Sequence, residues 1–239
     1  MRYLICLALL ALLPAAAFAQ DSEDPGIGAE IMVTGSRIER DDDSQRLPVI
    51  GLKRTADFAV QRVTVVGDTR EQQKRRDEIM AMVRGAIELA GRRGDIDLAT
   101  GAASVEPLTL ANYRNLQLAS DGRPDTDFAT FLVKTRLSGT DAKAALDRIA
   151  AFIKAVPTVG RAEMRAGSDL TLSIVGPDQY RGRIIDLVAA DAKATAAKFG
   201  PDYAVHASGL ERPVEWSRAS LTEVFLYVPY SYTVVPSPH

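Results

Sequence analysis

The segment VQRVTVVG at residues 60–67, together with the helix-forming residues 69–90 that follow it, decides the fold. Residues 60–67 are rich in β-branched side chains and end in glycine, which is typical of a strand. In residues 69–90 four apolar side chains recur at helical spacing: Ile79, Val83, Ile87 and Ala90. This pattern predicts an amphipathic helix that ends at Gly91. The next residues, 95–127, are irregular, and we expect short strands and a surface loop there.

Strand and helix patterns alternate again further along the chain. β-prone runs predict strands at residues 128–137, 161–165 and 169–175, the last two joined by a turn. Apolar residues at helical spacing predict two more amphipathic helices, at residues 140–156 and 177–199. The folded part therefore contains about three helices, each with an apolar face that a sheet can cover.

The end of the chain is rich in strands, which we expect at residues 203–210, 214–217 and 223–235. Alternate residues of the last run share one face: Val224, Leu226, Val228, Tyr230, Tyr232 and Val234. Pro229 cannot donate a ladder hydrogen bond, so this strand should lie at an edge or carry a bulge. The order of elements predicts an α+β domain over residues 59–236, with about three amphipathic helices packed on an antiparallel or mixed sheet.

The first nineteen residues have the features of a secretory signal. Arg2 precedes an apolar run at residues 3–13, and small residues follow up to Ala19. This pattern predicts a signal peptide over residues 1–19, cleaved after Ala19. The apolar run is shorter than the ~20 residues that span a bilayer, so an uncleaved anchor is the weaker alternative. We expect a protein exported to the periplasm of a Gram-negative envelope, with no transmembrane span in the mature chain.

Residues 20–58 differ from the rest in being polar, acidic and interrupted by Gly and Pro. Such a segment cannot bury enough apolar area to offset its chain entropy, so we expect a flexible polar arm. A short β-prone run at residues 30–38 interrupts it.

Composition excludes several kinds of site. Cys6, the only cysteine, lies in the signal, so the mature chain can form no disulfide and no thiolate metal site. Without Arg2, 28 Lys and Arg stand against 31 Asp and Glu, a net charge near −3. Nucleic-acid binding needs a basic patch, and none is evident, so we expect no nucleic-acid partner.

Catalytic motifs are also missing. The two histidines, His206 and His239, exclude a His-rich metal cluster, and no glycine-rich phosphate loop is present. His206 and Ser208 would share one face of a strand, and a hydrolase built on them is the enzymatic alternative. No G-x-S-x-G motif accompanies them, so we expect no enzyme, no catalytic residue, no metal and no cofactor.

Aromatic side chains gather late in the sequence, and four are candidates for an oligomer interface: Trp216, Tyr227, Tyr230 and Tyr232. Tyrosine and tryptophan are enriched at interfaces. The alternative is that they belong to the core of the sheet, with their polar atoms at its rim.

Three features together resemble the SIMPL domain family of exported bacterial proteins: the strand and long helix that begin at residues 63–67, the alanine-rich residues 190–196, and the aromatic β-rich end. The segment 111–114 also looks like the place where the family often has an aromatic. The resemblance covers about residues 59–236. It implies a SIMPL-like α+β fold and a non-enzymatic, homo-oligomeric periplasmic protein with relatives linked to envelope and oxidative stress. It brings no catalytic residues.

Residues 30–38 resemble a second group, the segment near the mature N-terminus of TonB-dependent outer-membrane receptors. The resemblance implies that Ile31, Met32, Val33 and Thr34 bind an envelope protein partner by adding a strand to its sheet. The remaining chain is far too short for a 22-stranded receptor barrel. A TonB-linked adaptor is therefore the alternative to an oligomeric structural protein.

Overall fold

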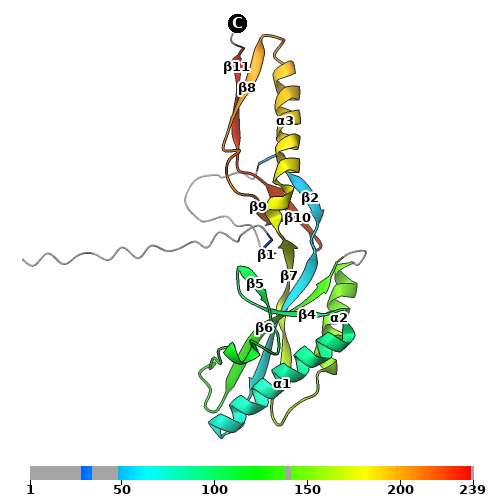
Figure 1. Cartoon of the computed structure of the whole chain (residues 1–239), viewed down its shortest axis with the longest axis vertical. Helices are drawn as coiled ribbons and strands as arrows, with labels where there is room; N and C mark the ends of the chain where they lie inside the picture. The colour runs from blue at the N-terminus through cyan, green and yellow to red at the C-terminus, as the bar shows by residue number, and fades with distance from the viewer. Residues whose placement is uncertain (1–27, 34–47, 138–140, 238–239) are drawn as a thin grey trace, which may run out of the picture.

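The computed structural model describes residues 28–33, 48–137 and 141–237 (Figure 1). The predicted signal at residues 1–19 lies outside them. Within the described residues the fold is mixed α+β, with antiparallel sheets and three α-helices: α1 (Gln72–Arg93), α2 (Ala142–Ala155) and α3 (Arg181–Ala197). Figure 1 shows an elongated molecule, with α1 and α2 at one end and α3 at the other. No helix of the described part has both the length and the apolar character needed to cross a membrane.

A closed barrel of six antiparallel strands forms the body of the molecule, in the order β1-β5-β4-β6-β3-β7. The strands are β1 (Glu30–Val33), β3 (Phe58–Gly67), β4 (Asp97–Thr100), β5 (Ser104–Pro107), β6 (Asp127–Arg136) and β7 (Glu163–Val175). β3, which contains the segment that decides the fold, pairs with β6 on one side and β7 on the other. It is therefore the central strand of the longest part of the barrel.

Side chains alternate between the inside and the outside of the barrel, so the strands contribute to three apolar clusters. α1 and α2 cover one outer face, where Phe131 and Phe152 are at most 1% exposed. Leu172 and Ile174 of β7 point to a second outer cluster, which includes α3. A third cluster contains Met32, Phe58, Val60, Ala99, Val105 and Leu132.

The helices begin and end near the predicted positions, and one end differs. α1 continues past Gly91, the predicted end, to Arg93, because Gly94 takes the left-handed conformation (φ 71°) and its N–H donates to the carbonyl of Ala90. α2 begins after Asp141, whose carboxylate accepts from the N–H of Ala144. α3 follows a short 3₁₀ turn, η2 (Pro177–Tyr180).

Two strand predictions need correction. The turn expected between residues 165 and 169 is absent, and β7 is one strand of 13 residues. The irregularity instead appears as a register shift against β3 between Gln61 and Val63. There the side-chain amide of Gln61 donates to the carbonyl of Gly167 at 2.8 Å, and a Cβ on Gly167 would come within 3.0 Å of the Arg62 carbonyl oxygen.

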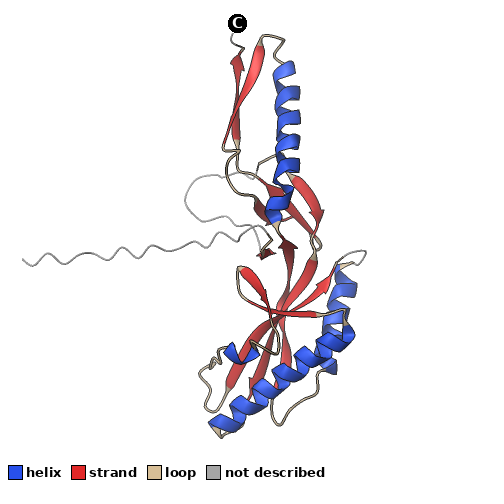
Figure 2. Cartoon of the chain, in the orientation of Figure 1, coloured by secondary structure: helices blue, strands red, loops and turns tan. Residues whose placement is uncertain are grey.

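The second correction concerns the last predicted strand, residues 223–235. The chain leaves the ladder around Pro229 and forms two strands in different sheets, β10 (Glu223–Tyr227) and β11 (Ser231–Pro236). β10 lies between β2 (Leu52–Thr55) and β9 (Glu215–Arg218), whereas β11 pairs only with β8 (Tyr203–Ser208). Figure 2 shows this last pair beside α3, away from the barrel.

The region expected to be a flexible polar arm contains two strands, β1 and β2. Ile31 is 2% exposed and Val33 is 0% exposed, although polar residues flank them in the sequence. The reason is that β5 and β7 supply both neighbouring edges for β1, so a few apolar residues are enough to bury it. β1 lies within the β-prone run noted at residues 30–38, whereas β2 was not expected from the polar composition of residues 20–58.

Candidate functional site

α3, β8 and β11 form a layered extension at one end of the molecule, here called the distal projection (Figure 1). Its buried residues, Ile184 and Val188, lie in the first half of α3. Beyond them, none of the described residues 189–210 and 230–237 is buried. The distal projection therefore extends from the body without a core of its own.

The hairpin of β8 and β11 faces α3 with one side. The hydroxyl of Tyr232 donates to the carboxylate of Asp191 at 3.1 Å and lies 3.4 Å from the hydroxyl of Thr195. The ring of Tyr230 stacks on that of Tyr232, with centroids 6.0 Å apart. Burial, with the negative charge of Asp191 nearby, raises the pKa of the Tyr230 hydroxyl. These contacts fix the hairpin on the helix through polar groups and partly exposed rings.

Apolar side chains are exposed along the distal projection. Phe199 and Tyr203, near the turn between α3 and β8, are 58% and 43% exposed, and their ring centroids are 6.0 Å apart. Leu187 on α3 is also exposed. Single exposed apolar residues are common on soluble proteins. Here, however, three of them lie on the distal projection, which has no core of its own.

The four aromatic candidates for an interface fall into two places. Tyr227 is 4% exposed and its ring stacks on Phe225, while Trp216 is partly buried on the neighbouring strand β9, opposite Leu226. Both belong to the three-stranded sheet. Tyr230 and Tyr232 lie on the distal projection, so the structure does not bring the four together on one surface.

The predicted partner-binding segment is part of the barrel. Ile31 and Val33 pack in the second outer cluster and Met32 in the third cluster, while Thr34 lies outside the described residues. β1 pairs with β5 and β7 along both edges. A partner could use these residues for strand addition only after β1 has left the barrel.

A buried ion pair, which the sequence patterns missed, joins β1 to β6, a strand that is not its neighbour in the barrel. The ammonium group of Lys134 on β6 contacts the carboxylate of Glu30, whose other oxygen accepts from the hydroxyl of Ser173 at 2.5 Å. The Lys134 nitrogen also lies 4.1 Å from the centre of the Phe58 ring. The available signal was a lysine directly after the apolar run FLV within the strand predicted at residues 128–137.

The hydrolase candidates do not form a catalytic arrangement. His206 and Ser208 lie on β8 and both are exposed. The Ser208 hydroxyl contacts that of Ser231 at 3.0 Å, across the hairpin. In the described part of the chain, no hydrogen bond joins His206 to Ser208 and no group of three His, Cys, Asp or Glu could hold a metal ion.

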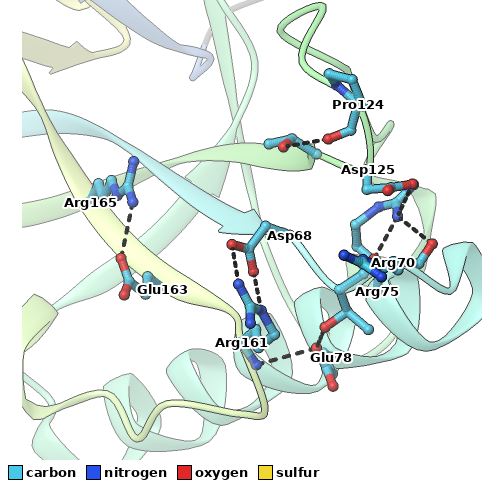
Figure 3. A network of polar contacts seen from close by, with 11 residues as sticks. Asp68, Arg70, Arg75, Glu78, Pro124, Asp125, Arg161, Glu163 and Arg165 are labelled. Carbon is cyan, nitrogen blue, oxygen red and sulfur yellow. Dashed lines mark hydrogen bonds and ion pairs between the residues drawn. The ribbon is translucent and has the colours of Figure 1, made fainter.

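A second polar cluster lies at the opposite end, where α1 begins (Figure 3). Arg75 is 6% exposed; its guanidinium donates to Asp127 at 2.5 Å and to the carbonyl of Thr69 at 2.6 Å. The hydroxyl of Thr69 donates to Glu78 at 2.5 Å. These contacts join the start of α1 to β6 and to the end of β3.

The same cluster also holds the segment before β7. Arg161 donates to both carboxylate oxygens of Asp68, at 2.6 and 2.7 Å, and its backbone N–H donates to Glu78. Gly160 has φ 56°, and a Cβ there would lie 2.3 Å from the Glu78 carboxylate, so any other residue would strain the backbone and displace this carboxylate. All these charged groups have partners within the chain, which indicates a structural rather than a catalytic cluster.

Acid should weaken this cluster. The hydrogen bond from Thr69 lowers the pKa of Glu78, and the one from Arg161 lowers the pKa of Asp68. Because their folded pKa values lie below the unfolded ones, the two carboxylates stabilise the fold above the unfolded pKa and lose that effect as the pH falls through the folded pKa. We expect the urea midpoint to fall as the pH decreases below about 5. Glu78→Gln should reduce this pH dependence, and an unchanged pH dependence in this variant would contradict the role of Glu78 in the cluster.

Comparison with known proteins gives no further guidance. No protein-family model, curated protein or solved structure matches this chain.

Proposed function

We propose that this chain is an exported periplasmic structural or interaction protein that works through homo-oligomerisation rather than catalysis, with the distal projection at the interface. The observation that supports it is the absence of any buried residue among the described residues 189–210 and 230–237. The SIMPL-like order of sequence features supports the same proposal, and with it a role in the envelope or in oxidative stress. No cofactor is required.

The hairpin of β8 and β11 has little apolar cover within its own chain. An isolated two-stranded hairpin is marginally stable in water and needs a third strand or an extensive apolar contact. α3 gives partial cover, since Tyr232 and Val234 are only half-buried. Burying the exposed rings of Phe199 and Tyr203 against a neighbour would add to the free energy of folding in the assembled state.

The proposal predicts the mass of the protein in solution. The chain, expressed with its first nineteen residues and purified from the periplasmic fraction, should begin at Gln20 and elute as an oligomer at micromolar concentration in size-exclusion chromatography with light scattering. A matched variant, Phe199→Ser with Tyr203→Ser, tests whether the exposed rings stabilise the oligomer. It should dissociate at a higher protein concentration than the wild type does. A strict monomer across the micromolar range would contradict the proposal.

A further inference from the structure

The described residues include four strands that pair on one side only. In the three-stranded sheet these are β2 and β9, and in the distal projection they are β8 and β11. A free edge presents unpaired N–H and C=O groups, and natural proteins protect such edges with charged side chains, bulges or proline. An edge that has none of these protective features is open to pairing with another strand.

Only the edges at the three-stranded sheet carry charge. β2 contains Lys53 and Arg54, and β9 contains Glu215 and Arg218. β8 has the sequence YAVHAS and β11 the sequence SYTVVP, with no Asp, Glu, Lys or Arg in either. The one protective residue is Pro236 at the last position of β11. The distal projection thus presents two edges that are open to pairing.

The register of the hairpin shows which backbone groups face outward. The N–H of Ser237 donates to the carbonyl of Asp202 at 2.7 Å, which continues the register of β8 and β11. In an antiparallel pair, hydrogen-bonded and non-hydrogen-bonded positions alternate. The outward-pointing positions that carry an N–H are therefore Tyr203, Val205 and Ala207 on β8 and Tyr232 and Val234 on β11.

We propose that the partner of the distal projection is a second copy of this chain, with β8 of one copy adding antiparallel to β11 of the next. β8 and β11 run in opposite directions within one hairpin. When two projections lie side by side and point the same way, β8 of one copy is antiparallel to β11 of its neighbour. Because both edges are uncharged, this head-to-tail contact uses both, and only a closed ring leaves neither exposed. The inference rests on the proposed homo-oligomer.

Two proline variants test the pairing in the full mature chain. Val205→Pro removes an outward N–H from β8, and Val234→Pro removes one from β11, while the hydrogen bonds within the hairpin stay available because both residues lie at non-hydrogen-bonded positions. Val205→Thr and Val234→Thr are the matched controls, since they keep the N–H and the branched shape. The measurement is the mass by light scattering, with circular dichroism and thermal unfolding to check the fold.

Head-to-tail pairing gives a specific pattern of masses. Each proline variant alone should be a monomer, both threonine variants should keep the wild-type mass, and an equimolar mixture of the two proline variants should stop at twice the monomer mass. Formation of that dimer also shows that both hairpins remain folded.

Other outcomes overturn the pairing. Wild-type mass for either proline variant alone, a mixture that stays monomeric, or loss of assembly in the threonine controls would each reject it while the wild type remains oligomeric. A monomeric wild type would instead reject the proposed function itself, so the two failures are distinguishable.

Discussion

Replacing Lys134 with alanine is expected to lower the free energy of unfolding by about 3–5 kcal/mol. The side chains of Lys134 and Glu30 are only 7% and 14% exposed, so the substitution leaves the Glu30 carboxylate buried without its charged partner. Within the part of the chain that the structure describes, the Ser173 hydroxyl would remain as the one hydrogen-bond donor to this carboxylate. Urea unfolding followed by circular dichroism measures the change.

The double variant Glu30→Leu with Lys134→Met is the matched control for this prediction. Replacing a buried ion pair by apolar residues of similar volume is often neutral or stabilising. We therefore expect the double variant to be much more stable than Lys134→Ala. A loss below about 1 kcal/mol in the single variant would show that water solvates the pair and that β1 is not fixed by it.

The second large effect is expected at Arg75. Arg75→Met keeps much of the aliphatic side chain but removes the guanidinium that joins Asp127 to the carbonyl of Thr69. The loss of hydrogen bonds to a charged group, with a partly buried carboxylate left behind, should cost about 3 kcal/mol. The comparison is Arg84→Met on the same helix, where the exposed pair with Glu88 should contribute less than about 1 kcal/mol. Equal losses in the two variants would contradict the structural role of the Arg75 cluster.

Much of the α+β architecture could be predicted from periodicity. The β-branched residues of β3 and β6 and the apolar stripes of α1 and α2 depend on local pattern and burial on one face, which are written directly in the sequence. The ends of elements depended on single residues with special conformations. Gly94, rather than Gly91, takes the left-handed conformation that ends α1.

Barrel closure could not be predicted, because it depends on pairing between distant segments. β1 lies 139 or more residues from its partners on β7, as in the pair Val33 and Leu172, and the β-prone run at residues 30–38 does not indicate which strands it pairs with. The ion pair between Glu30 and Lys134 could not be predicted for the same reason, because the two residues are distant in the sequence and meet only in the folded barrel. Local composition instead favoured a flexible segment.

The candidate interface shows a similar limit. Counting aromatic residues identified Tyr230 and Tyr232, which lie on the distal projection, but it also selected Tyr227, which the fold buries. The edges of β8 and β11 were not identified, because a strand edge is defined by the absence of a neighbour in space. The sequence shows that both strands lack charged residues, but this indicates an unprotected edge only once the structure places the strands at an edge.

Amide hydrogen exchange of the wild-type protein, read at single residues by mass spectrometry, tests the role of the distal projection most directly. Tyr203, Val205, Ala207, Tyr232 and Val234 point their N–H groups away from their own hairpin. In an assembly that pairs these edges, the outward amides should exchange as slowly as the inward ones at Ala204 and Thr233, and should become fast on dilution to monomer. Fast exchange at the outward positions under conditions where the protein is oligomeric would contradict assembly by pairing of the β8 and β11 edges.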